Sequence, residues 1–343
     1  MAPVVQCARK MFMWCYAVLM ATTMTIEGKQ NHSVLNKEAP TPTMNEGCWV
    51  FLHMPKSGGT TIKTLLHMAA HANNIRQAHV MDNDYINGAS GRREAEKVLR
   101  QGKGMVYGGY AETLRASFGD SQCKWFTVFR HPVSRLVSAY FYCKFIKRGD
   151  SLCHEKAIDL DTIDIASFAE HWGNYGLRQY ALAFFSADDL LASRASKTCK
   201  NCPGWFRVKR YLENLQQQVV NDNVVATPSN FLNDDSSLYA FLEPALEIIS
   251  SRYAAVGILE NLNTTMHLFD STLGIPNFSW TIEIENVGEA NSDHKRKDQE
   301  HAALLEASID PSVIRFIWLD IILYEHALSI HASQAKKYGL TNP

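Results

Sequence analysis

The segment at residues 49–61, WVFLHMPKSGGTT, limits the possible folds of this chain more than any other part of its sequence. It opens with aromatic and branched apolar residues, which predict a buried β-strand, and continues into a Pro-Lys-Ser-Gly-Gly turn. Apolar residues then recur at helical spacing from Ile62 to Ala70, which predicts a helix after the turn. This order of elements forms a phosphate cradle, because glycines let the backbone approach an anion and a helix N-terminus attracts negative charge.

The position of the lysine separates two kinds of phosphate cradle. A nucleotide triphosphatase loop has the pattern GxxxxGK[ST], in which lysine follows the last glycine. Here Lys56 precedes Gly58 and Gly59, so the sequence argues against such a loop. A P-loop small-molecule kinase therefore stays only as an alternative, beside an incidental glycine turn that binds no ligand.

A second segment, residues 125–141, repeats the strand-to-helix design. Its apolar strand ends at Arg130, and Pro132 suits the first position of a helix because its missing N–H costs nothing there. The apolar residues of this helix form one stripe, and Ser138 lies off that stripe. An arginine at the end of a strand and a hydroxyl two turns along the next helix suit a phosphate group.

Together the two segments resemble the sulfotransferases that use 3′-phosphoadenosine 5′-phosphosulfate (PAPS). The residues KSGGTT at 56–61 resemble their 5′-phosphosulfate loop, and Arg130 with Ser138 resembles their 3′-phosphate segment. His131 departs from the family pattern, in which aspartate or asparagine is frequent at this position. The residues VGILENL at 256–262 resemble a late strand and helix start of the carbohydrate sulfotransferases, especially the heparan and chondroitin uronyl 2-O type.

This resemblance, which covers residues 49–338, implies an α/β fold of the P-loop type. A central parallel β-sheet flanked by helices would form three layers. The resemblance also implies PAPS as co-substrate, no metal, and a carbohydrate hydroxyl as acceptor. The basic residues at 292–297 are predicted to form a compact turn that closes over the nucleotide. The donor-binding residues that the resemblance implies are Lys56, Ser57, Gly58, Gly59, Thr60, Thr61, Arg130, Ser138, Arg296 and Lys297.

The sequence differs from the family at the position where the general base is expected. The uronyl 2-O enzymes carry histidines in the glycine turn that corresponds to residues 107–110, and this chain has none there. Glu112 is the nearest ionisable residue, so we predict Lys56 and Glu112 as the catalytic pair, with His53 and His131 as alternative bases. A non-catalytic, glycan-binding lumenal relative of the same fold is the alternative function.

Composition and the N-terminal sequence predict the cellular location of this domain and the class of its partners. The formal net charge is −1, which indicates no general attraction to nucleic acid. An uncharged run at residues 11–26 follows Arg9 and Lys10, which predicts a signal-anchor or a signal peptide over residues 1–26. Residues 27–47 are predicted to be a polar stem, and residues 48–343 the sulfotransferase domain. We expect a single-pass type II Golgi membrane protein with a lumenal domain, or a secreted protein if the segment is cleaved.

The cysteines and the sequons are typical of a protein of the secretory pathway. Cys48 and Cys123 each precede a predicted strand, so they could form a disulfide if those strands are parallel neighbours. Cys199 and Cys202 form a CxxC pair with no second pair, which favours a disulfide over zinc. The Asn-x-Ser/Thr sequons begin at residues 31, 263 and 277.

Two further patterns make predictions that a structure can test. His67 and His71 have the i, i+4 spacing of metal ligands, but no third ligand is indicated, so we expect ordinary surface or core histidines. Residues 311–338 predict a final amphipathic helix or pair of helices, in which Arg315, Asp320 and Glu325 argue against a membrane span.

Overall fold

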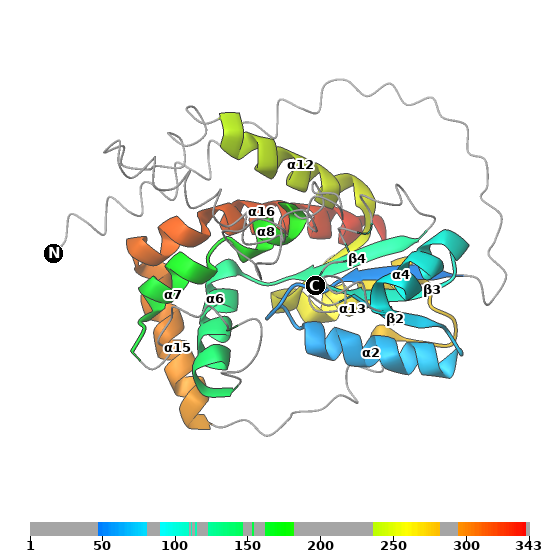
Figure 1. Ribbon diagram of the computed structural model, residues 1–343, viewed down its shortest axis with the longest axis horizontal. Coiled ribbons are helices and arrows are strands. Elements are labelled where there is room, and N and C mark those ends of the chain that lie inside the picture. The colour runs from blue at the N-terminus through cyan, green and yellow to red at the C-terminus, as the bar shows by residue number, and fades with distance from the viewer. Residues whose placement is uncertain are drawn as a thin grey trace.

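A computed structural model describes residues 47–80, 90–109, 111, 114, 123–146, 153, 162–181, 236–281 and 294–340. In this part of the chain five strands form one parallel sheet in the order β2-β3-β1-β4-β5 (Figure 1). The strands are β1 (Cys48–Leu52), β2 (Gln77–His79), β3 (Gly104–Gly108), β4 (Lys124–Phe129) and β5 (Tyr253–Ile258). The predicted central parallel sheet is therefore confirmed.

The described helices lie on both faces of the sheet and beyond the carboxyl ends of its strands (Figure 1). They are α2 (Gly59–Ala72), α4 (Ser90–Gln101), α6 (Pro132–Phe141), the π-helix η1 (Tyr142–Ile146), α7 (Ile165–Trp172), α8 (Tyr175–Ala181), α12 (Ser236–Arg252), the 3₁₀-helix η4 (Leu259–Asn261), α13 (Leu262–Leu273), α15 (His294–Ile309) and α16 (Pro311–Lys337).

The alternation of side chains along β1 explains the three layers. Val50 and Leu52 face one hydrophobic core, which α4, α8, α12 and α16 cover. Trp49 and Phe51 face a second core, which α2 and α13 cover. Because helices cover both faces, every residue of β1 is buried and the strand is apolar throughout. The expected α/β fold with flanking helices is confirmed.

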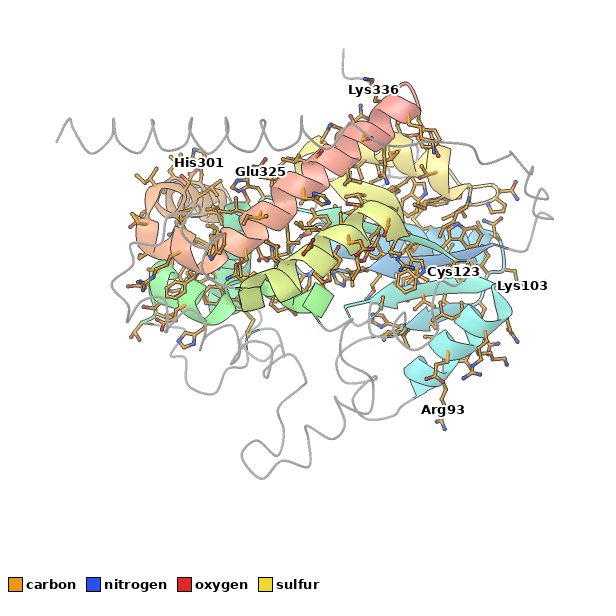
Figure 2. The ribbon with its side chains drawn as sticks, turned by 90° about the horizontal axis from the view of Figure 1, so that it is seen from above. Arg93, Lys103, Cys123, His301, Glu325 and Lys336 are labelled. Carbon is orange, nitrogen blue, oxygen red and sulfur yellow. A yellow bond between two sulfur atoms is a disulfide. The ribbon has the colours of Figure 1, made fainter. Side chains whose placement is uncertain are left out.

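A disulfide joins the beginnings of two neighbouring strands. Cys48 starts β1, Cys123 directly precedes β4, and their Cα atoms are 4.5 Å apart in the bonded pair. Figure 2 shows Cys123 and Lys103 at the same end of the sheet, where the strands begin. The predicted pairing is confirmed, and its condition holds because β1 and β4 are parallel neighbours. Cys143 and Cys153 form a second disulfide that the sequence did not predict, while Cys199 and Cys202 lie outside the described residues.

One prediction about the C-terminal part needs correction. The basic residues at 294–297, which include Arg296 and Lys297, are not in a turn, because α15 begins at His294 and continues through them. Lysine and arginine have good helix propensity, which is consistent with a helical start. Asp320, in the final helix α16, is buried with 3% of its surface exposed.

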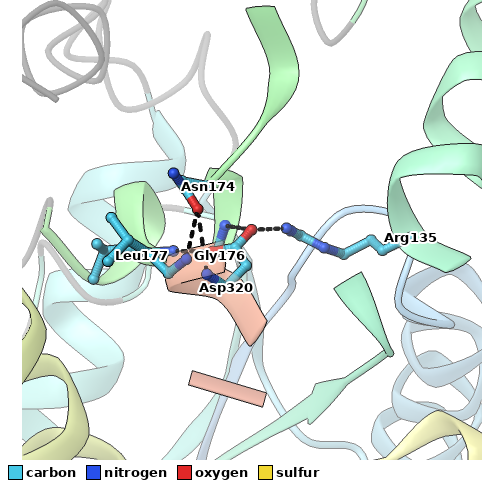
Figure 3. Close-up of polar contacts among 6 residues, drawn as sticks. Arg135, Asn174, Gly176, Leu177 and Asp320 are labelled. Atoms are coloured by element: carbon cyan, nitrogen blue, oxygen red, sulfur yellow. Dashed lines mark hydrogen bonds and ion pairs between the residues drawn. The ribbon is translucent and has the colours of Figure 1, made fainter. Parts of the chain in front are cut away.

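Asp320 is buried because its carboxylate has several donors around it. It forms an ion pair with the Arg135 guanidinium of α6, and it accepts hydrogen bonds from the backbone N–H groups of Gly176 (3.1 Å) and Leu177 (2.8 Å) (Figure 3). The carboxylate thus joins α16, α6 and the start of α8 at one point. Helical spacing alone could not predict this, because the partners come from distant segments of the chain.

No helix in the described ranges is both long enough and apolar enough to cross a membrane. The predicted N-terminal segment at 1–26 lies outside those ranges, as does all of the predicted stem except Gly47.

The buried ion pair leads to a stability prediction. We expect Asp320→Asn to lower the free energy of unfolding by about 3 kcal/mol, because it leaves the Arg135 guanidinium buried without a counter-charge. Urea unfolding at neutral pH measures this loss. Glu325→Gln on the same helix is the control, because Glu325 is exposed. Equal, small effects of both substitutions would contradict the role of Asp320.

Candidate functional site

The loop between β1 and α2 has the backbone geometry of an anion cradle. Gly58 precedes α2 with φ 75°, and Lys56 also adopts a left-handed conformation with φ 64°. The left-handed φ favours glycine here, and a Cβ atom on Gly58 would lie 2.8 Å from a methyl carbon of Leu259, which would have to shift. No side chain in the described residues caps α2, which leaves its first amides available to an anion.

The second glycine of the loop makes room for His53. A Cβ atom on Gly59 would lie 1.9 Å from the imidazole ring, so the ring packs directly against the glycine backbone. Burial lowers the pKa of His53 to about 4, with smaller contributions from Lys63, His79 and Lys56. The imidazole is therefore neutral at physiological pH and lies beneath the phosphate cradle.

The second predicted segment meets the first at the same edge of the sheet. Strands β1 and β4 are paired in parallel, and the Thr127 hydroxyl donates to the Leu52 carbonyl at 3.1 Å. Arg130, directly after β4, donates from Nη1 to the carbonyl of Lys56 at 3.1 Å. Burial lowers the pKa of Arg130, which Glu260 and Glu300 partly oppose, and the guanidinium stays charged. The two predicted phosphate-binding junctions are therefore in direct contact.

Helix α6 places Ser138 two turns beyond this contact. Pro132 occupies the first turn of the helix, as predicted, and the predicted apolar stripe is buried except that Tyr140 is only partly covered. Ser138 lies off this stripe and is partly exposed, so its hydroxyl is accessible. Arg135, one turn earlier, is buried in the ion pair with Asp320, which ties α6 to α16.

Glu260 is a residue of the site that the sequence did not assign a role. It follows β5, and its carboxylate accepts hydrogen bonds from the backbone N–H of His131 (2.9 Å) and the hydroxyl of Tyr324 (3.2 Å). The ring of His131 packs edge-on against Tyr324, with 5.3 Å between the ring centroids. Burial and the adjacent Glu260 raise the pKa of Tyr324, so the hydroxyl stays protonated and donates. The Glu260 carboxylate, which lies just after β5, thus holds the start of α6 through the backbone of His131.

The remaining predicted residues lie around this edge or outside the described part. The backbone N–H of His53 donates to the carbonyl of Gly108 at 3.1 Å, so the glycine turn after β3 lies beside the phosphate loop. Glu112, two positions before the buried Leu114, lies outside the described residues. The backbone of Arg296 and Lys297 is in the first turn of α15.

Metal ligation has no support in the described ranges. These ranges hold no group of three or more His, Cys, Asp or Glu residues that could bind a metal ion. His67 Nε2 instead forms a hydrogen bond of 2.9 Å with the hydroxyl of Tyr107, as expected of an ordinary histidine.

The fold and the site define a P-loop-type α/β protein in which the two predicted anion-binding junctions meet at one edge of the sheet. A family model described as "Sulfotransferase family" matches residues 49–325, which is more than half of the chain and includes both junctions. The chain belongs to the sulfotransferase family. A search of curated proteins finds no match.

The partly buried imidazole of His53 predicts a pH dependence of stability. The unfolded chain binds the His53 proton near pH 6.5, whereas the folded chain binds it only near pH 4. Acidification through this interval therefore favours the unfolded state, by up to about 3 kcal/mol in total.

Urea unfolding across this pH interval, compared between the wild type and His53→Asn, measures this contribution. We expect the variant to lose less stability on acidification than the wild type. His301→Asn is the matched control, because His301 is exposed. The same pH dependence in all three proteins would contradict a partly buried, neutral His53.

Proposed function

We propose that this sulfotransferase uses PAPS as its donor and transfers the sulfuryl group to a hydroxyl of a carbohydrate, on a glycan or proteoglycan. The main support is the hydrogen bond from Arg130 Nη1 to the Lys56 carbonyl, which joins the two anion-binding junctions. A donor with phosphate groups at both ends of one adenosine fits two adjacent cradles. A triphosphate would need only the first of them.

The residues present fit such a donor. Lys56 and the amides of Gly58–Thr61 bind the 5′-phosphosulfate end, in a loop whose left-handed Gly58 leads directly into α2. Arg130 and Ser138 bind the 3′-phosphate, through a planar fork of donors and one hydroxyl. Arg296 and Lys297, at the start of α15, are the proposed cover of the nucleotide.

The chemistry follows from positioning and charge. Sulfuryl transfer by analogy with phosphoryl transfer has a loose, in-line transition state, in which negative charge develops on the leaving group. Lys56 and the first amides of α2 stabilise that charge on the 5′-phosphate. The phosphate is already held by cations, so the proposed mechanism requires no metal.

The acceptor hydroxyl needs a base within hydrogen-bond reach. Glu112 is the proposed base, since it follows the glycine turn that lies beside the phosphate loop. The two alternatives are less suitable, because the ring of His53 is packed against Gly59 and that of His131 against Tyr324. A non-catalytic glycan-binding relative is the second candidate function, and it would be unaffected by Glu112→Ala.

The proposed location is the lumen of the Golgi, with the N-terminal segment as membrane anchor. Two disulfides support an oxidising compartment, since cytosolic thiols are normally kept reduced. Asn263 and Asn277 of the sequons are exposed, which glycosylation requires.

Ligand-induced thermal stabilisation tests the donor. We expect adenosine 3′,5′-bisphosphate to raise the melting temperature much more than AMP or ATP, because only this nucleotide places a phosphate at Arg130. Arg130→Met should remove most of this preference, while Arg315→Met, an exposed control on α16, should keep it. Equal shifts from all three nucleotides in the wild type would exclude the proposed donor.

Transfer of labelled sulfate from PAPS to a panel of desulfated glycans tests the reaction. We expect Lys56→Ala to reduce the rate by about 100-fold or more, because it removes a charge that stabilises the leaving group. Lys103→Ala should keep the wild-type rate, since Lys103 is exposed at the opposite end of the sheet (Figure 2). Full transfer by Lys56→Ala would contradict the mechanism.

A further inference from the structure

The ammonium group of Lys56 lies over the ring of Tyr142, with Nζ 4.1 Å from the ring centroid. Tyr142 is the first residue of η1, which continues α6 without a break. A cation at this distance from an aromatic face is attracted by the negative charge of that face. Ser138 lies one turn earlier than Tyr142, so the ring and the proposed 3′-phosphate ligand share one side of the helix.

The main chain of Lys56 is held by the same part of the molecule. Its carbonyl accepts the hydrogen bond from Arg130, and its φ of 64° is uncommon for a residue other than glycine. Such a conformation persists when surrounding contacts determine it. Both the carbonyl and the ammonium of this lysine are therefore in contact with the β4–α6–η1 segment.

The turn that carries Tyr142 is itself anchored. Cys143, the next residue, is fully buried and forms the disulfide with Cys153. It packs in a third hydrophobic core with Phe168 and Trp172 of α7. Single π-helical turns occur frequently at functional sites, because they redirect side chains within a helix. The ring thus has a rigid support from which to hold a flexible side chain.

We propose that Tyr142 is a positioning residue that orders Lys56 before the donor binds, an inference that rests on the proposed function. The ring contacts the ammonium of the same lysine that is proposed to bind the 5′-phosphosulfate end of the donor. A lysine that is already ordered loses less conformational freedom on binding, so the donor binds more tightly. Tyr142 acts through Lys56 and does not itself contact the donor.

Calorimetric titration with adenosine 3′,5′-bisphosphate tests this role in a set of variants. We expect Tyr142→Leu to weaken binding about fivefold, or about 1 kcal/mol, because it removes the aromatic face. Tyr142→Phe should bind within about twofold of the wild type, since it keeps that face. Pentafluorophenylalanine at position 142 should weaken binding as leucine does, because its ring keeps the shape but reverses the charge of the face.

A double-mutant cycle separates positioning from packing. If Tyr142 acts through the ammonium, Tyr142→Leu should have no further effect in a Lys56→Ala background. A loss of affinity that persists in that background would overturn the inference. The inference would also be overturned if the leucine variant and the pentafluoro variant both bound the nucleotide as tightly as the wild type, or more tightly.

The wild type distinguishes this failure from that of the proposed function. If the wild type does not bind adenosine 3′,5′-bisphosphate, the donor assignment fails and the role of Tyr142 fails with it. If the wild type binds and the phenylalanine and pentafluoro variants bind equally well, only the role of Tyr142 fails. This comparison uses two rings of similar shape, so it does not depend on the folding of the leucine variant.

Discussion

The parallel pairing of β1 with β4 is the constraint on which the site depends. Parallel neighbours end at the same edge of a sheet, so the loops that follow them meet there. The register from Trp49–Lys124 to Leu52–Thr127 sets this alignment, and the Cys48–Cys123 disulfide joins the two segments where the strands begin. At the other end, Arg130 and Lys56 are 74 positions apart in sequence and joined by one hydrogen bond.

The surroundings of this edge hold the second junction in place through two polar contacts, one buried and one exposed. Asp320 pairs with Arg135 on α6, and Glu260 accepts the backbone N–H of His131 just before that helix begins. Each carboxylate comes from an element far along the chain, α16 in one case and the end of β5 in the other. The C-terminal part of the chain thus holds in place the helix that carries Ser138.

Local patterns were sufficient to predict the strand-to-helix junctions and to suggest one disulfide, whereas the parallel sheet was implied by the family resemblance. The loop at 56–61 could be predicted because glycine, lysine and helix periodicity are all read from adjacent residues. The pairing of Cys48 with Cys123 followed from strand adjacency, which the alternation of strands and helices favours. Gly59 was assigned to the loop, but its contact with His53 needed the folded structure, since the two meet only across the turn.

Contacts between distant segments could not be predicted from sequence. The apolar spacing of residues 311–338 carries no information about Arg135 on α6, the buried cation with which Asp320 pairs. Tyr142 was part of an aromatic run with no assigned role, and only the fold brings its ring to Lys56. The basic residues at 292–297 were predicted to form a turn that closes over the nucleotide, as the resemblance implied, but α15 already begins at His294.

One measurement tests the central claim most directly, a crystal structure of the protein with adenosine 3′,5′-bisphosphate. The account predicts a single nucleotide with its 5′-phosphate at the amides of Gly58–Thr61 and its 3′-phosphate within hydrogen-bond distance of Arg130 and Ser138. A nucleotide bound away from this edge of the sheet, or one with both phosphates at a single junction, would contradict the claim that the two junctions hold opposite ends of one donor.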